Sequence, residues 1–239
     1  MCKAHNKTLP HGPIEEVFPD VFMVTGTMRN EFFGAMWQFS RNMTIVRQDG
    51  ELTLLNAVRL DEEGLAALDA LGTVKHVMQI GGMHGHDDRF YVDRYKATFW
   101  SVPGMPRDEG ITESKDLVAG GELPFDGASL FVFEQTKIPE AIVLLHREGG
   151  IAIACDSLQN WTGPDAYMDE STIEKMEGMG FFAPANLGVA WMHVNEPKPG
   201  DFERLKSLTF DHALVGHGSP VKGGADAAYH ATFTRLLGV

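Results

Sequence analysis

The chain has 239 residues, of which 44% are hydrophobic and 22% are charged, a composition typical of one globular domain with a full hydrophobic core. Its formal charge of −13 argues against a nucleic-acid-binding or anionic-membrane-binding protein, because both functions need a basic surface. No apolar run approaches the ~18 residues of a transmembrane helix, and the first residues lack the apolar core of a secretory signal, so we expect a cytoplasmic protein.

The first part of the chain is predicted to be a loose segment followed by strands. Residues 1–16 hold two prolines and few apolar anchors, so we expect them to be loosely ordered and residues 17–239 to form one domain. Apolar patterns predict strands over residues 21–24, 43–47 and 51–56. Asp49-Gly50 lies between the last two strands and predicts a hairpin turn, because both residue types tolerate positive φ.

A helix with clear end signals comes next. Asp61 is placed to cap its free amide groups, and Gly72 is expected to end it in the left-handed conformation. Three leucines form its apolar face: Leu65, Leu68 and Leu71.

The rest of the chain mixes strands and helices. Predicted strands cover residues 74–80, 98–102, 129–134, 141–146, 151–155 and 213–215. Predicted helices cover residues 90–95, 169–179, 187–194, 201–208 and 225–237, and residues 108–126 have the composition of an irregular loop. Two blocks rich in strands, each followed by helices, indicate an α/β sandwich with sheets inside and helices outside.

The loop after residues 74–80 contains the sequence HGHDD, in which His84 and His86 are two positions apart. In an extended loop these imidazoles can point the same way, and Asp88 can join them. Imidazole and carboxylate together are good ligands for zinc, iron and manganese. The alternative interpretation is a polar loop whose histidines make hydrogen bonds or face solvent.

Two further strands also end in candidate ligands. Asp156 follows residues 151–155, where a buried carboxylate is costly without a partner, although it also suits the capping of a turn. Cys155 faces the other side of that strand and is expected to be a core thiol. His217 follows residues 213–215 between two glycines, a position that equally fits a histidine in a tight turn.

In this order, the HxHxD loop, the aspartate after a strand and the late Gly-His-Gly resemble the metallo-β-lactamase superfamily. The resemblance covers residue 21 to the C-terminus. It implies a four-layer αβ/βα sandwich with a metal site at the edge between two sheets. It also implies that five residues occupy metal-ligand positions: His84, His86, Asp88, Asp156 and His217.

Two positions depart from the family pattern. Arg89 stands where the pattern has a histidine, and no histidine precedes Pro139, where Lys137 is the best positional match. A unit charge ~4 Å from a divalent ion repels it by roughly 8 kcal/mol at an effective dielectric constant near 20. Unless both side chains point outward, we therefore expect at most one bound ion.

The resulting hypothesis is a metal-dependent hydrolase with a mononuclear site, holding zinc or alternatively iron or manganese. The ion would activate water to attack a small ester, thioester, amide or phosphoester, with Asp88 orienting that water or acting as the base. Arg89 and Lys137 would bind an anionic group of this small-molecule substrate.

The main alternative is a metal-free binding module, in which the same two cations neutralise Asp88 and Asp156. An iron-based oxidoreductase is a third alternative. Neither nucleic acid nor a membrane is an expected partner, and the sequence does not indicate an oligomeric state.

Overall fold

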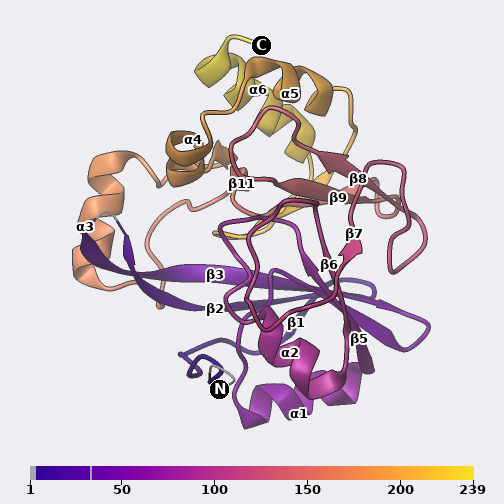
Figure 1. Cartoon of the computed structure of the whole chain (residues 1–239). Helices are drawn as coiled ribbons and strands as arrows, with labels where there is room; N and C mark the ends of the chain where they lie inside the picture. The colour runs from indigo at the N-terminus through magenta and orange to yellow at the C-terminus, as the bar shows by residue number, and fades with distance from the viewer. Residues whose placement is uncertain (1–3, 33) are drawn as a thin grey trace.

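The computed structural model describes residues 4–32 and 34–239. Two β-sheets lie face to face, and helices cover the outer face of each (Figure 1).

The first sheet comes from the N-terminal half of the chain. Within the described residues its strand order is β1-β2-β3-β4-β5-β6-β7. The strands are β1 (Glu15–Phe18), β2 (Val21–Phe32), β3 (Ala35–Gln48), β4 (Glu51–Leu55), β5 (Thr73–Gln79), β6 (Thr98–Ser101) and β7 (Lys115–Asp116). Strands β1 to β4 pair antiparallel and β4 to β7 pair parallel. Two helices pack on its outer face, α1 (Glu62–Leu71) and α2 (Asp88–Tyr95).

The second sheet comes from the C-terminal half, in the order β14-β13-β10-β9-β8 over the part of the chain described. Its strands are β8 (Ala128–Val132), β9 (Ala141–Leu145), β10 (Ile151–Ile153), β13 (His212–Leu214) and β14 (Val221–Lys222). Three helices cover its outer face: α4 (Val189–Asn195), α5 (Pro199–Leu205) and α6 (Ala225–Leu237). A short pair, β11 (Leu158–Gln159) and β12 (Asn186–Leu187), lies beside them, and α3 (Glu170–Met179) packs against the β2–β3 hairpin.

Side-chain alternation along the strands builds this layered arrangement. In β2, Val21 and Met23 lie in the core between the sheets, whereas Phe22 and Val24 lie in the core under α1 and α2. Strand β10 alternates in the same way. Ile151 and Ile153 lie in the core between the sheets, and Ala152 lies in the core under the helices of the second sheet. Each sheet is therefore apolar on both faces, which requires helices outside and confirms the predicted α/β sandwich.

The end signals of α1 act partly as predicted. The Asp61 carboxylate accepts a hydrogen bond from Gly64 N at 2.8 Å, and the turn residues Asp49 and Gly50 both have positive φ. The left-handed conformation predicted for Gly72 is wrong, because its φ of 159° and ψ of −165° are extended. A Cβ at Gly72 would lie 2.5 Å from Gly50 O, so glycine is needed here for a close backbone approach.

The N-terminal residues are held more firmly than the sequence indicates. Gly12 N donates to Thr25 O at 2.8 Å, and Thr27 N donates to Pro10 O at 2.9 Å. Pro10, Gly12 and β1 thus extend the edge of the first sheet, partly within the segment 1–16 that was predicted to be loosely ordered. The partner strand β2 is itself longer than the four residues predicted, because β2 and β3 form one long hairpin. The predicted loop over 108–126 similarly contains β7.

Among the described residues, none of the helices has the length and apolar character needed to cross a membrane.

Candidate metal site

Three loops at one edge of the sandwich bring together three of the predicted ligands. His84 lies in the loop between β5 and α2 of the first sheet. Asp156 follows β10 and His217 follows β13, two neighbouring parallel strands of the second sheet. Because the carboxyl ends of parallel strands meet at one sheet edge, the last two residues are adjacent although 61 positions separate them.

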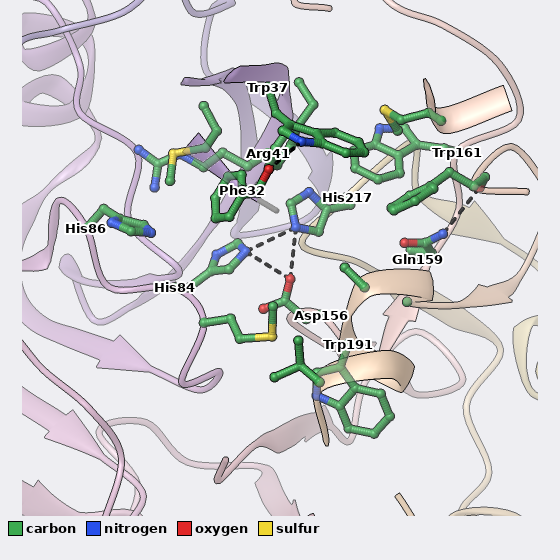
Figure 2. Close-up of a pocket in the computed structure, with 18 residues that line it drawn as sticks. Phe32, Trp37, Arg41, His84, His86, Asp156, Gln159, Trp161, Trp191 and His217 are labelled. Carbon is green, nitrogen blue, oxygen red and sulfur yellow. Dashed lines mark hydrogen bonds and ion pairs between the residues drawn. The ribbon is translucent and has the colours of Figure 1, made fainter. Parts of the chain in front are cut away.

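The three side chains form a compact triangle of possible ligand atoms (Figure 2). His84 Nε2 lies 3.1 Å from His217 Nε2 and 3.4 Å from Asp156 Oδ1, and His217 Nε2 lies 3.0 Å from the same oxygen. Ligands about 2.0–2.1 Å from a tetrahedral zinc ion are about 3.3 Å apart. The triangle therefore fits three ligands of one ion.

The surroundings favour the protonation states that a metal needs. Burial lowers the pKa of His84, so its imidazole is neutral near neutral pH. His217 Nδ1 lies 2.9 Å from the carbonyl oxygen of Ser40, a contact that fixes the orientation of the ring. Burial acts to raise the pKa of Asp156, but the two imidazoles outweigh it and hold that pKa well below its usual range.

The loop of Asp156 is stabilised from behind by a buried acid. Glu140 Oε1 accepts a hydrogen bond from Ser157 N at 2.6 Å, and burial raises the pKa of Glu140 well above its usual value. Cys155 is buried in the central core, as predicted, and its thiol lies 3.4 Å from Asp156 Oδ2. These contacts fix the direction of the Asp156 side chain.

Asn42, on β3, fixes the loop of His217 from the opposite sheet. Its Nδ2 donates to Val215 O at 2.9 Å and to Gly218 O at 2.6 Å, and its backbone N donates to Gly216 O at 2.8 Å. The loop thus has polar contacts from Asn42 on both sides of its histidine.

We expect Asn42→Ala to lower metal affinity by about 10- to 100-fold, because it releases the loop that orients His217. The two carbonyl groups that lose their donor should also cost about 1–3 kcal/mol of unfolding free energy. Metal titration and urea unfolding of the same samples measure both effects. Asn30→Ala, an exposed position on the same hairpin, serves as the control. Unchanged metal affinity in Asn42→Ala would show that the loop holds His217 without this amide.

A pocket with apolar walls opens beside the triangle (Figure 2). We call it the aromatic pocket, with a volume of about 230 Å³. Its large apolar side chains are Phe32, Trp37, Phe39, Trp161, Phe181 and Trp191. Trp161 packs against the imidazole of His217 with ring centroids 4.7 Å apart. The candidate ligands therefore form a polar spot on the wall of a mostly apolar cavity.

No protein-family model and no curated protein matches the chain. Solved structures do match it over nearly its full length. The DIM-1 metallo-β-lactamase, in a structure exposed to ceftazidime, is 14% identical with a TM-score of 0.60, covering 96% of this chain and 99% of that one. A metallo-β-lactamase from Erythrobacter litoralis is 14% identical with a TM-score of 0.57, covering 93% and 92%. FIM-1 from Pseudomonas aeruginosa, in its mono-zinc form, is 13% identical with a TM-score of 0.53, covering 97% and 98%.

The chain has the metallo-β-lactamase fold. This confirms the fold that the sequence resemblance implied. The triangle lies at the edge between the two sheets, where the resemblance placed the metal site.

The HxHxD loop is arranged differently from the expectation for a metallo-β-lactamase fold. His84 and His86 were both predicted as metal ligands whose imidazoles can point the same way, but His86 lies apart from the triangle, beyond His84 (Figure 2). The residue between them, Gly85, has φ of +91° and turns the backbone, so the two imidazoles diverge. Burial and the Arg41 charge lower the pKa of His86 to about 4, so it is neutral near neutral pH.

Asp88 does not line the aromatic pocket. It begins α2, is fully buried, and neither carboxyl oxygen makes a hydrogen bond of standard geometry to a described residue. Burial, with the neighbouring charge of Asp87, raises the pKa of Asp88 to about 7. Its predicted roles as ligand and base thus stay predictions without a contact to the triangle.

The buried ion pair beside the site is formed by Asp87 and Arg41, not by the pairs of Asp88 and Asp156 with Arg89 and Lys137 considered above. The Asp87 carboxylate also accepts hydrogen bonds from Arg59 N at 2.9 Å and Asn6 Nδ2 at 3.2 Å. Arg41 additionally donates to Ala57 O at 3.2 Å. The cation beside the triangle is therefore Arg41 on β3, not Arg89 or Lys137.

The structure places both predicted substrate-binding cations away from the aromatic pocket. Lys137 is mostly exposed and pairs with Glu196 at 2.7 Å. Arg89 is buried on α2, where it pairs with Asp93 at 3.3 Å and Asp108 at 3.5 Å. Each cation has an acid of its own within reach, so neither is directed toward Asp156. The anion-binding role proposed for them therefore has no support from their positions.

Sequence reasoning missed Arg41, Asn42 and Ser40, which all come from β3. All three residues are polar and buried. They precede the strand predicted over residues 43–47, so the sequence analysis did not place them in the sheet.

Proposed function

We propose that this protein is a hydrolase that holds one divalent ion at His84, Asp156 and His217. The observation that carries the proposal is the triangle, whose spacings of 3.0–3.4 Å suit three ligands of a single ion. Three protein ligands leave a coordination position for water or substrate, as in catalytic zinc sites. Zinc is the metal we propose, since FIM-1, a protein of the same fold, has a mono-zinc form.

When bound, such an ion lowers the pKa of water and polarises the bond to be cleaved. The protein's own groups supply position and charge. Asp156 contributes the negative charge of the ligand set, and the Ser40 carbonyl fixes the ring orientation of His217. The apolar walls of the aromatic pocket and the burial of the three ligand side chains lower the local dielectric constant, which strengthens electrostatic interactions there.

The Arg41 position supports one ion as opposed to two. A second ion bound by His86 and Asp88 would lie in the region that the Arg41–Asp87 ion pair already occupies. Like charges at such short range repel strongly in a buried site. We therefore propose a mononuclear site, and we place its activity on small-molecule substrates in the cytoplasm, where a chain with two cysteines and no disulfide framework is typical.

Metal analysis of protein purified without chelator tests this proposal. Wild type should carry about one zinc per chain, and His84→Ala combined with Asp156→Ala should carry almost none. His146→Ala is the control, because His146 is exposed and lies in the β9–β10 turn. Equal metal content in wild type and the double variant would contradict the proposal and favour a metal-free binding module.

Activity provides the second readout. Wild type loaded with zinc should hydrolyse p-nitrophenyl esters, and the double variant and chelated wild type should not. If zinc is bound but no ester, thioester, amide or phosphoester in a panel is hydrolysed, the result supports the proposed metal site and contradicts the proposed hydrolase function.

A further inference from the structure

A second pocket adjoins the aromatic pocket and has the opposite character. We call it the basic pocket, because four cationic side chains line it: Lys7, Arg29, Arg41 and Arg59. Asp87 is the single acid among the described residues that line it. The volume is about 290 Å³. In a chain with a formal charge of −13, this is a local excess of positive charge facing a cavity.

Two of these cations are built into the protein. Arg41 is 5% exposed, and the guanidinium of Arg59 lies 3.1 Å from the ring centroid of Phe90. The Nε atoms of both arginines are buried and have no hydrogen-bond acceptor among the described residues. Asp87 pairs with Arg41, and its hydrogen bond with Arg59 goes to the backbone amide. Within the part of the chain that the structure describes, the guanidinium of Arg59 therefore has no carboxylate within ion-pair distance. An anionic group in the pocket would pair with the guanidinium of Arg59.

The two pockets are adjacent. Met28, Arg41 and His86 line both of them. The triangle of candidate ligands lines the aromatic pocket beside this shared wall (Figure 2). A molecule spanning the shared wall would therefore have its middle near the proposed reaction site.

We infer that the substrate of this site is an amphipathic anion. Its apolar part fills the aromatic pocket, and its carboxylate or phosphate group binds in the basic pocket. That this molecule is a substrate rests on the proposed hydrolase function. Its binding depends only on the two pockets. It moves the anion-binding role from Arg89 and Lys137 to Arg29, Arg41 and Arg59.

Calorimetric titration with three probes tests the inference on the zinc-loaded protein. Octanoate carries both features, 1-octanol carries the apolar chain alone, and acetate carries the anion alone. Octanoate should bind at least about tenfold more tightly than either of the others, because a hydrogen bond to a charged group adds to the burial of the chain. Octyl phosphate in place of octanoate then shows which anion the pocket prefers.

Two variants locate the parts of the probe. Arg29→Gln combined with Arg59→Gln should weaken octanoate binding about tenfold and leave 1-octanol binding unchanged. Phe32→Ala should weaken both. The matched control for charge is Lys75→Gln combined with Arg235→Gln, two exposed positions outside both pockets, which should change neither.

Three results would overturn the inference. The first is octanoate binding no tighter than 1-octanol, and the second is normal octanoate binding by the double arginine variant. Octanoate binding that disappears on chelation of the zinc, in a protein that remains folded, would place the carboxylate on the ion instead. The metal content of each sample is measured separately, so a failure of the proposed metal site can be distinguished from a failure of this inference. Protein that holds no zinc but still binds octanoate through its arginines would contradict the hydrolase proposal and support the two-pocket binding site.

Discussion

Asp87→Asn is expected to destabilise the fold by about 3–5 kcal/mol, the largest stability effect that we predict for a single substitution near the site. The variant leaves the Arg41 guanidinium buried without its carboxylate, at a position where the Arg41 and Asp87 side chains are 6% and 3% exposed. The neutral amide also weakens the bonds from Arg59 N and Asn6 Nδ2. Urea unfolding at pH 7 in the presence of chelator measures the loss.

The control removes both charges at once. Arg41→Met combined with Asp87→Leu should be much closer to wild type than Asp87→Asn alone, because replacing a buried ion pair by apolar groups is often neutral. If the double variant is as unstable as the single one, the loss comes from packing and backbone contacts and not from an uncompensated charge.

Asp88→Asn is expected to have the opposite effect, although the two aspartates are adjacent. Burial raises the pKa of Asp88 to about 7, against an ordinary value of 3.8, so ionised Asp88 destabilises the folded chain. Below pH 4 the carboxyl is protonated in both folded and unfolded states and has no effect. Between pH 4 and 7 the unfolded chain releases the proton first, and the cost grows to about 4 kcal/mol above pH 7.

The measurement is the unfolding free energy of wild type and Asp88→Asn between pH 4 and pH 8, with chelator present. The difference in favour of the variant should increase as pH rises and level off above pH 7. A constant difference across this range would show that Asp88 does not titrate near neutral pH. A difference in favour of wild type at pH 8 would show that an ionised Asp88 has a stabilising partner.

Most of the fold could be predicted because most strands and helices have local sequence signals, namely apolar patterns and turn or capping residues. The helix 225–237 was predicted with its observed bounds, and the hairpin turn at Asp49-Gly50 was correct. The long β2–β3 hairpin was not predicted, because residues 25–42 interrupt the apolar alternation with Gly26, Asn30 and Gly34. Its pairing depends on twelve residue pairs across the hairpin, which no short window of sequence contains.

The site was only partly predictable, and the reason is long-range geometry. His84, Asp156 and His217 each follow a strand, so fold topology alone brings them together. The divergence of His86 depends on one positive φ at Gly85. The pairing of Asp87 with Arg41 joins residues 46 positions apart, and the sequence has no local signal for it. Arg89 pairs with Asp93 on its own helix and Lys137 pairs with Glu196, which a positional match to a family pattern does not reveal.

The origin of the three candidate ligands has a thermodynamic consequence. His84 belongs to the first sheet, and Asp156 and His217 belong to the second, so only the folded chain holds them within 3.4 Å. An ion that binds the folded state alone stabilises it by about 2.7 kcal/mol when its free concentration is 100 times its Kd. Zinc bound at this site would therefore link the two sheets of the sandwich. The free zinc concentration would then set how much stability the ion adds to the folded chain.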